Sequence, residues 1–170
     1  MASVESVVVA TSAFGPRPLL PVIRGNLLLV NTTFIAHQCN CETSRAQGLA
    51  YTIFRKFPHT NTYTSGSMRH VGTIDVFRAP TLYEGPGVIN MYAQRSPGRA
   101  GREHDTASHR AHWFRQCLHA MVMLRTESIA FPCYIGCALA GGEWHRYHRM
   151  ITTFAHQNPT IRVIIVKLDV

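Results

Sequence analysis

The sequence predicts a single three-layer α/β domain, in which helices cover both faces of a mixed, largely parallel β-sheet. Two observations lead to this prediction. Short runs of apolar and β-branched residues alternate along the chain with longer segments of helical periodicity, as in sheets that are covered by helices. The chain has 170 residues, 46% of them hydrophobic and 15% charged, so it is long and apolar enough to bury one core.

Residues 1–20 are interpreted as an extension that leads into the main domain, residues 21–170. The extension carries a β-branched segment at residues 6–11, which predicts a short strand, and then a proline-rich loop. No basic region precedes an apolar stretch at the N-terminus, and no apolar run approaches the roughly 20 residues that span a bilayer. We therefore expect neither a secretory signal nor contact with a membrane.

The first half of the domain predicts three strands and one helix. Strands are expected at residues 22–30 and 33–37, separated by a turn, and at residues 71–77. Apolar side chains at helical spacing predict a helix over residues 45–57, which Pro58 ends.

The second half repeats the alternation. Short apolar runs predict buried strands, and longer periodic segments predict helices, with Asp105 as the N-cap of the first helix. The expected elements are a strand at residues 87–92, a helix at 106–124, a strand at 128–131, a helix at 143–154 and a closing strand at 161–168.

Charge and cysteine content restrict the partners and the compartment. The net charge is +8, and Lys56 and Lys167 are the only lysines among 17 basic side chains. Arginine suits bidentate phosphate contacts, which favours an anionic ligand or a nucleic acid. The arginines are scattered, however, and this favours a solvated basic surface over a dedicated nucleic-acid face. Five cysteines without a secretory signal predict free thiols and an intracellular protein, cytoplasmic or nuclear.

Metal binding is the less favoured reading of the cysteine and histidine pattern. The pairs Cys39/Cys41 and Cys133/Cys137 lack the two-residue gap that is common in zinc sites. Two histidine pairs lie one helical turn apart, but no third ligand is evident for either, and a solvated helix face explains them. We expect no metal and no cofactor.

Ligands of open α/β sheets bind beyond the carboxyl ends of the strands, which directs attention to three loops. The first, after His37, contains Asn40, whose amide can bond a sugar hydroxyl as donor and as acceptor, and it ends at Gly48, where a helix N-terminus favours an anion. An ordinary strand–turn–helix connection explains it equally well. The second loop carries Asn90 and Gln94, and simple strand termination explains it better when it is taken alone.

The third loop, residues 135–144, has three glycines within seven residues between a buried strand and a helix. Such a loop exposes backbone N–H groups that can hold phosphates, and the dipole of the following helix supports them. Trp144 adds an aromatic face. A flexible connector is the alternative, but the position between strand and helix favours phosphate binding.

Taken together, these segments resemble a macro domain over roughly residues 22–168. The resemblance rests on Gly25-Asn26-Leu27, Ile35-Ala36-His37-Gln38-Cys39-Asn40-Cys41, Gly48-Leu49-Ala50, Phe57-Pro58, Val88-Ile89-Asn90-Met91-Tyr92-Ala93-Gln94, Ser128-Ile129-Ala130-Phe131-Pro132 and the loop from Gly136 to Trp144. The segments are similar to the branch that contains ADP-ribose-1''-phosphate phosphatases and ADP-ribosyl hydrolases.

The resemblance implies a three-layer macro domain fold and an ADP-ribose site. It implies that Asn40 contacts the distal ribose, that Gly48 and its neighbours form one phosphate loop, and that the third loop forms the other. Asn26 stands where many macro domains place an aspartate that reads the adenine amino group. The implied ligand-binding residues are Asn26, Leu27, Cys39, Gly48, Leu49, Ala50, Asn90, Gln94, Pro132, Ile135, Gly136, Cys137, Ala138, Leu139, Ala140, Gly141, Gly142 and Trp144.

Two departures from this branch bear on mechanism. Gln94 occupies the place of a lysine, and Ala140 the place of a catalytic aspartate, which argues against a lysyl mechanism. His37 matches the phosphatase-like members and titrates in the range that suits acid–base catalysis. On these grounds His37, together with Asn40, is named as a candidate catalytic residue. A buried, structural role explains His37 equally well.

Two functions remain open at this point, and a basic nucleic-acid-binding domain is a third, less favoured one. The first is hydrolysis of ADP-ribose-1''-phosphate, or removal of ADP-ribose from modified macromolecules. The second is a non-catalytic reader of ADP-ribose that also contacts nucleic acid through its arginines. For both, we expect a monomer whose partners are ADP-ribose or a derivative, and ADP-ribosylated protein or nucleic acid.

Overall fold

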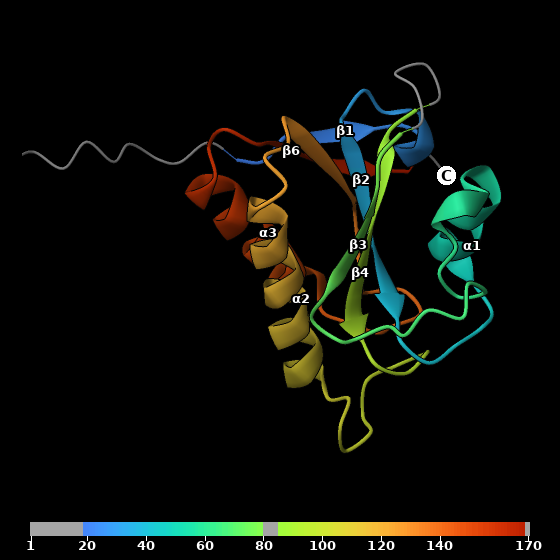
Figure 1. Cartoon of the computed structure of the whole chain (residues 1–170). Helices are drawn as coiled ribbons and strands as arrows, with labels where there is room; N and C mark the ends of the chain where they lie inside the picture. The colour runs from blue at the N-terminus through green and yellow to red at the C-terminus, as the bar shows by residue number, and fades with distance from the viewer. Residues whose placement is uncertain (1–18, 80–84, 169–170) are drawn as a thin grey trace, which may run out of the picture.

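A computed structural model describes residues 19–79 and 85–168 of the chain, and Figure 1 shows a central sheet with α1 on one side and α2 and α3 on the other. The expected strand at residues 6–11 and most of the predicted extension lie outside the described residues. The elements are β1 (Val22–Arg24), η1 (Leu27–Leu29), β2 (Phe34–Asn40), α1 (Gly48–Lys56), η2 (Pro58–Thr60), β3 (Ile74–Phe77), β4 (Gly87–Gln94), α2 (Ala107–Val122), β5 (Ser128–Pro132), α3 (Trp144–Gln157) and β6 (Arg162–Lys167).

The six strands form one mixed sheet in the order β1-β6-β5-β2-β4-β3. Among these described strands, β3 and β4 pair antiparallel, and the other neighbours are parallel. This arrangement confirms the predicted three-layer fold with a largely parallel sheet. Because β2, β4 and β5 run in the same direction, the three loops that the sequence singled out leave the same edge of the sheet.

Two element boundaries differ from the prediction for a local reason. The expected strand at residues 22–30 stops at Arg24, because Gly25 has a φ of +149° and Asn26 then caps η1 by accepting a hydrogen bond from the backbone N–H of Leu28 at 2.9 Å. The expected helix at residues 45–57 begins only at Gly48. It ends before Pro58, as predicted.

The sheet buries both of its faces. On the side of α2 and α3, Phe34 and Ala36 of β2 pack with Phe114 and other apolar residues of the helices. On the side of α1, Ile35 and Cys39 of the same strand pack in a second cluster around α1. Burial on both faces is typical of a central parallel strand, and it fixes the positions from which the loops leave. Within the described ranges, no helix has the length and apolar character needed to cross a membrane.

Candidate anion-binding site

Three loops gather where β2, β4 and β5 end: residues 41–47, 95–106 and 133–143. The register places Asn40, the last residue of β2, beside Gln94, the last residue of β4. In Figure 1 the arrows of β2 and β4 both point to the lower end of the molecule, where these loops lie. The structure therefore brings together the loops in which the sequence places most of the candidate site residues.

The glycine-rich loop after β5 presents free backbone donors. Its turns are closed by hydrogen bonds from the N–H of Cys137 to Tyr134 O (2.9 Å), of Gly141 to Ala138 O (3.2 Å) and of Gly142 to Gly136 O (2.9 Å). Between these turns, the N–H groups of Ala138, Leu139 and Ala140 have no acceptor among the described residues. Three consecutive N–H groups without partners are suited to bind the oxygens of a phosphate.

Two helices begin at this edge without a side-chain cap. The N-cap residues Gln47 of α1 and Glu143 of α3 make no capping hydrogen bond, whereas Thr106 caps α2 through the backbone N–H of His109 at 3.2 Å. Uncapped N-termini keep unpaired N–H groups and a partial positive charge, and both attract anions. α1 follows residues 41–47, here called the β2 loop, and α3 follows the glycine-rich loop. Of the three α-helices described, these two therefore leave their N-terminal N–H groups without a side-chain cap.

The β2 loop and the glycine-rich loop approach each other closely. Gly48, the first residue of α1, has a φ of +55°, which favours glycine. A Cβ atom at this position would lie 3.3 Å from Cδ1 of Leu139, whose side chain is 59% exposed. The free N–H groups of the glycine-rich loop therefore lie close to the N-terminus of α1, and a side chain at Gly48 would occupy the space between them.

A buried arginine ties the second loop to the third. Arg110 of α2 is 2% exposed and makes a bidentate ion pair with Asp105, with Nε–Oδ1 and Nη2–Oδ2 distances of 2.6 Å. Its Nη1 donates to the carbonyl oxygens of Gly98 (2.7 Å) and Ala140 (3.2 Å). Asp105 in turn accepts from the backbone N–H of Ser96 at 2.9 Å. Arg110 thus fixes the glycine-rich loop beside the β4–α2 loop.

The prediction that Asp105 caps α2 is wrong. Burial is the largest single influence and acts to raise the pKa of Asp105, but the hydrogen bonds from Arg110 and from the Ser96 backbone, together with the charge of Arg110, outweigh it and hold the pKa below its usual value. Thr106 caps the helix instead. Sequence reasoning missed Arg110, although it occupies a position on the apolar face of α2 together with Phe114 and Cys117, where a lone arginine needs a buried partner.

Two glutamine side chains bridge the ends of β2 and β4. Gln38 Nε2 donates to Gln94 Oε1 at 2.7 Å, and Gln94 Nε2 donates to Ser96 O at 2.9 Å. Gln94 therefore uses its amide within the protein. Gln38 Oε1 is buried, accepts no hydrogen bond from residues 19–79 or 85–168, and lies 2.7 Å from where a Cβ at Gly136 would stand. Gln38 was not among the predicted site residues, and it offers an acceptor beside the glycine-rich loop.

Asn40 shapes the first loop. Its Oδ1 accepts from the backbone N–H groups of Glu42 (3.2 Å) and Thr43 (2.8 Å), and its Nδ2 donates to the Tyr63 hydroxyl at 3.2 Å. The side chain is buried. These bonds engage both the oxygen and the nitrogen of its amide within the protein. Contact of Asn40 with a ribose or with a reacting group stays a prediction.

His37 lies in the core on the side of α1. The residue is 1% exposed, its Nε2 is 2.7 Å from Oδ1 of Asn90, and its ring makes an edge contact with Phe54 at 5.4 Å between centroids. Burial lowers the pKa of His37 to about 4, against the opposing effect of the hydrogen bond with Asn90. At neutral pH His37 is uncharged and shielded from solvent, which argues against the predicted catalytic role.

This burial predicts a pH-dependent stability. The pKa of His37 is about 4 in the folded protein and 6.5 in the absence of burial, so the unfolded chain binds more protons between these values. The free energy of unfolding is expected to fall by up to roughly 3 kcal/mol as the pH drops from above 6.5 to 4. Urea denaturation of the wild type and His37→Gln at several pH values measures this. An unchanged slope in the variant would contradict the assignment.

Some of the other predicted ligand-binding residues lie at or next to these loops, and others lie elsewhere in the fold. Leu49 and Ala50 belong to the first turn of α1, and Trp144 begins α3 and contacts the rings of Tyr134 and His148 at 5.4 Å. Pro132 ends β5, and Ile135, like Cys39, is buried. Asn26 and Leu27 lie at η1, where Asn26 caps the helix and Leu27 is buried in the core. No described contact joins those two residues to the glycine-rich loop.

The chemistry of the cysteines does not favour a nucleophile here. Burial raises the pKa of Cys41 and of Cys137 to about 11, so both thiols are protonated at neutral pH. Over residues 19–79 and 85–168, no group of three or more histidine, cysteine and acidic side chains is placed to hold a metal ion. What the edge offers is backbone N–H groups and helix N-termini, which bind anions.

Comparisons with known proteins agree with the architecture. No protein-family model matches the sequence, and no curated protein matches it. Solved structures do match. The macro domain of Mycobacterium tuberculosis DarG is 18% identical, with a TM-score of 0.72 over 87% of this chain and 97% of the other. The macro domain of Thermus aquaticus DarG is 22% identical, with a TM-score of 0.65 over 88% and 97%.

A third similar structure was solved with a ligand. The Trypanosoma brucei macro domain in complex with ADP-ribose is 14% identical, with a TM-score of 0.61 over 86% of this chain and 62% of the other. These similarities show that the chain has the macro domain fold, as the sequence predicts.

Proposed function

We propose that this protein binds ADP-ribose, free or attached to a macromolecule, with the diphosphate between the glycine-rich loop and the N-terminus of α1. The observation that carries the proposal is the set of three consecutive free N–H groups at Ala138, Leu139 and Ala140, close to the uncapped N-terminus of α1. The macro domain fold supports it, since a similar macro domain was solved with ADP-ribose.

Charged and polar side chains near the loop fit this ligand. Arg99 is exposed and lies along the loop, with its Cγ 2.9 Å and its Nη1 3.4 Å from where a Cβ at Gly141 would stand. Its guanidinium suits a diphosphate. Gln38 Oε1 accepts no hydrogen bond from the described residues, and a ribose hydroxyl can donate one to it. Arg99 and Gln38 therefore complement the backbone donors with a positive charge and with an acceptor.

Binding is tested by calorimetric titration of the purified chain with ADP-ribose. We expect saturable binding of one ligand per chain, and no saturable heat with ribose, which lacks the diphosphate. A titration without heat up to near-millimolar ADP-ribose would contradict the proposal.

Hydrolysis of ADP-ribose-1''-phosphate, or release of ADP-ribose from modified macromolecules, is the further activity that the sequence suggests. The geometry gives less support to turnover than to binding. His37 is buried and uncharged, both ends of the Asn40 amide are engaged, and Gln94 stands in place of a lysine. We therefore propose a monomeric reader of ADP-ribosylated protein or nucleic acid.

Assays for phosphate released from ADP-ribose-1''-phosphate, and for ADP-ribose released from modified protein, separate the two functions. If the wild type releases either product and Asn40→Ala does not, the protein is a hydrolase and the proposal of a reader is wrong.

A further inference from the structure

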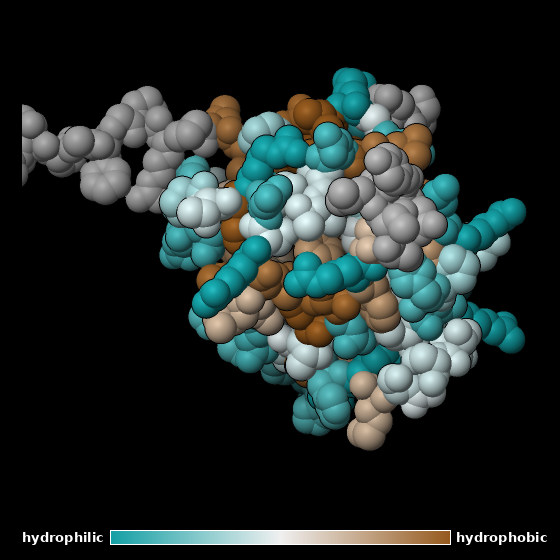
Figure 2. All heavy atoms as spheres, turned by 45° about the horizontal axis from the view of Figure 1, so that its top comes forward, coloured by the Kyte–Doolittle hydropathy of each residue, from teal (hydrophilic) through white to brown (hydrophobic). Residues whose placement is uncertain are grey.

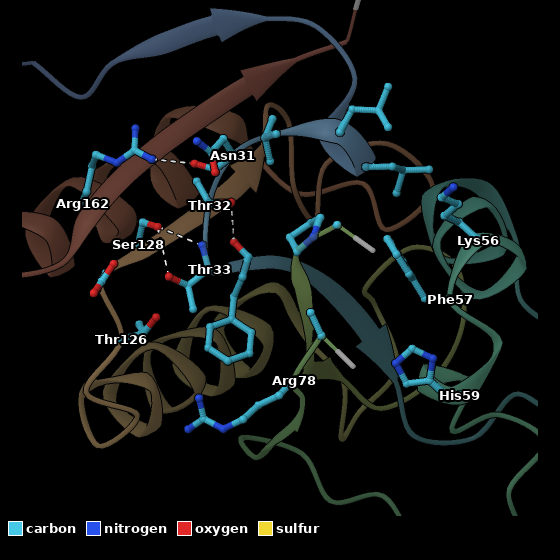
Figure 3. A pocket seen from close by; sticks show the side chains of 18 of the residues that line it. Asn31, Thr32, Thr33, Lys56, Phe57, His59, Arg78, Thr126, Ser128 and Arg162 are labelled. Carbon is cyan, nitrogen blue, oxygen red and sulfur yellow. Dashed lines mark hydrogen bonds between the residues drawn. The ribbon is translucent and has the colours of Figure 1, made fainter. Parts of the chain in front are cut away.

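A second hollow lies at the opposite edge of the sheet, where β2, β4, β5 and β6 begin. Its volume is about 1310 Å³. Its described wall comes from residues 28–34, the end of α1 and the residues after it, the residues that follow β3 and precede β4, residues 125–128 and the start of β6. Figure 3 shows it from close by, and Figure 2 shows hydrophilic side chains bordering an apolar area on the upper side of the molecule. Because the strands are parallel, this cavity and the proposed ADP-ribose site lie at opposite ends of β2.

The wall of this cavity is strongly basic. Among the described residues, it carries Lys56, Arg78, Arg125 and Arg162, and one acidic residue, Glu127. Within the described wall, four cations against one carboxylate leave an excess of three positive charges, without counting His59. In the described part of the chain, none of these four cations takes part in a salt bridge. Uncompensated positive charge in a hollow raises the local concentration of anions.

Two of the arginines are held in place before any ligand arrives. Arg162 Nη2 donates to the carbonyl oxygen of Asn31 at 2.7 Å, and the Arg78 guanidinium lies 5.7 Å from the ring centre of Phe34. Arg125 has a φ of +48°, a backbone conformation that costs a non-glycine residue about 1–3 kcal/mol and occurs often at functional sites. Restrained guanidinium groups lose less entropy on binding than free ones do.

A buried hydroxyl in the same wall lacks a partner. Thr126 is 8% exposed, and its Oγ1 makes no hydrogen bond with the described part of the chain. By contrast, the hydroxyls of Thr33 and Ser128 lie 3.3 Å apart, and Ser128 Oγ also accepts from the backbone N–H of Thr33 at 2.9 Å. Figure 3 shows Thr126 beside this pair. Buried polar groups are nearly always paired, so Thr126 indicates a ligand group that is absent here.

We propose that this cavity binds the phosphodiester backbone of single-stranded RNA, independently of the ADP-ribose site. Arginine and hydroxyl side chains are the usual donors to backbone phosphates. Figure 3 shows Lys56, Arg78 and Arg162 on different sides of the cavity, an arrangement that suits a ligand with several phosphates in a row. The volume also exceeds the roughly 300–1,000 Å³ of most small-molecule sites. RNA is thus favoured over a single phosphate or a mononucleotide.

Fluorescence anisotropy with a fluorescein-labelled ten-nucleotide oligouridine tests the proposal. The double variant Arg78→Gln/Arg125→Gln is compared with Arg115→Gln/Arg149→Gln, which removes the same charge from exposed positions on α2 and α3. We expect binding about 10-fold weaker in the cavity variant, with a shallower salt dependence, and a change below about twofold in the control. Equal losses in both variants, or no binding by the wild type in 50 mM salt, would overturn the proposal.

Two competition arms locate the RNA and define its chemistry. Saturating ADP-ribose is expected to leave the affinity for the oligouridine within about twofold, and complete displacement would place the RNA at the other edge of the sheet. Pyrophosphate at matched ionic strength is expected to compete at least about 100-fold more weakly than unlabelled oligouridine, because it contacts fewer cations. Equal competition would show a small-anion site and overturn the assignment to RNA.

Discussion

Gly48→Val is expected to weaken ADP-ribose binding at least about 10-fold while leaving the fold intact. The branched side chain would stand within about 3.3 Å of Leu139 Cδ1, in the space between the glycine-rich loop and the N-terminus of α1. It would also be strained, because the φ of +55° costs an ordinary residue roughly 1–2 kcal/mol. Calorimetric titration gives the affinity, and far-UV circular dichroism with thermal unfolding shows whether the fold is kept.

Gly66→Val is the matched control for this variant. Gly66 has a similar φ of +72°, but the space where its Cβ would stand is open to 4 Å. The strain is therefore comparable, whereas the site is left free. We expect the Gly66 variant to bind ADP-ribose within about twofold of the wild type. Equal loss of affinity in both variants would show that strain, and not obstruction of the site, is responsible.

Arg110→Met is expected to lower the free energy of unfolding by about 3–5 kcal/mol. The change removes both ion-pair hydrogen bonds from Asp105, which is 1% exposed, and leaves its carboxylate buried without a cation. It also frees the carbonyl oxygens of Gly98 and Ala140, so the glycine-rich loop loses its attachment to α2. Urea denaturation at pH 7 measures the stability.

Two further variants separate the buried pair from general effects on α2. Arg115→Met removes an exposed arginine from the same helix and is expected to change stability by less than about 0.5 kcal/mol. Arg110→Met/Asp105→Leu is expected to be less destabilised than the sum of its single variants, by about 2 kcal/mol, because neither charge remains unpaired. A loss below about 1 kcal/mol in Arg110→Met would refute the proposed role of the pair.

The order of the elements and the fold class could be predicted because both depend on local patterns. Alternation of apolar runs with helical periodicity identified the strands β2 to β6 and all three α-helices, and Pro58 ended α1 where expected. The break at Gly25 was missed, because the apolar residues continue through η1 and only the φ of that glycine interrupts the strand. Hydrophobic pattern alone does not report such a change of direction.

The candidate site was predictable where it depends on backbone and less so where it depends on long-range side-chain contacts. The glycine spacing identified the loop that carries the free N–H groups. The pairing of Arg110 with Asp105, and that of Gln38 with Gln94, join residues from different elements, so local sequence does not reveal them. His37 illustrates the same restriction. The alternation along β2 places it opposite to Gln38, but only packing against α1 shows that this face is closed.

The central claim is that ADP-ribose binds with its diphosphate on the free N–H groups of the glycine-rich loop. Titration of ¹⁵N-labelled protein with ADP-ribose, followed by amide chemical shifts, tests it directly. We expect the largest shifts at Ala138, Leu139, Ala140 and Gly48, with little change around Thr126 at the opposite edge of the sheet. Shifts confined to that opposite edge, or no shifts at near-millimolar ligand, would contradict the claim.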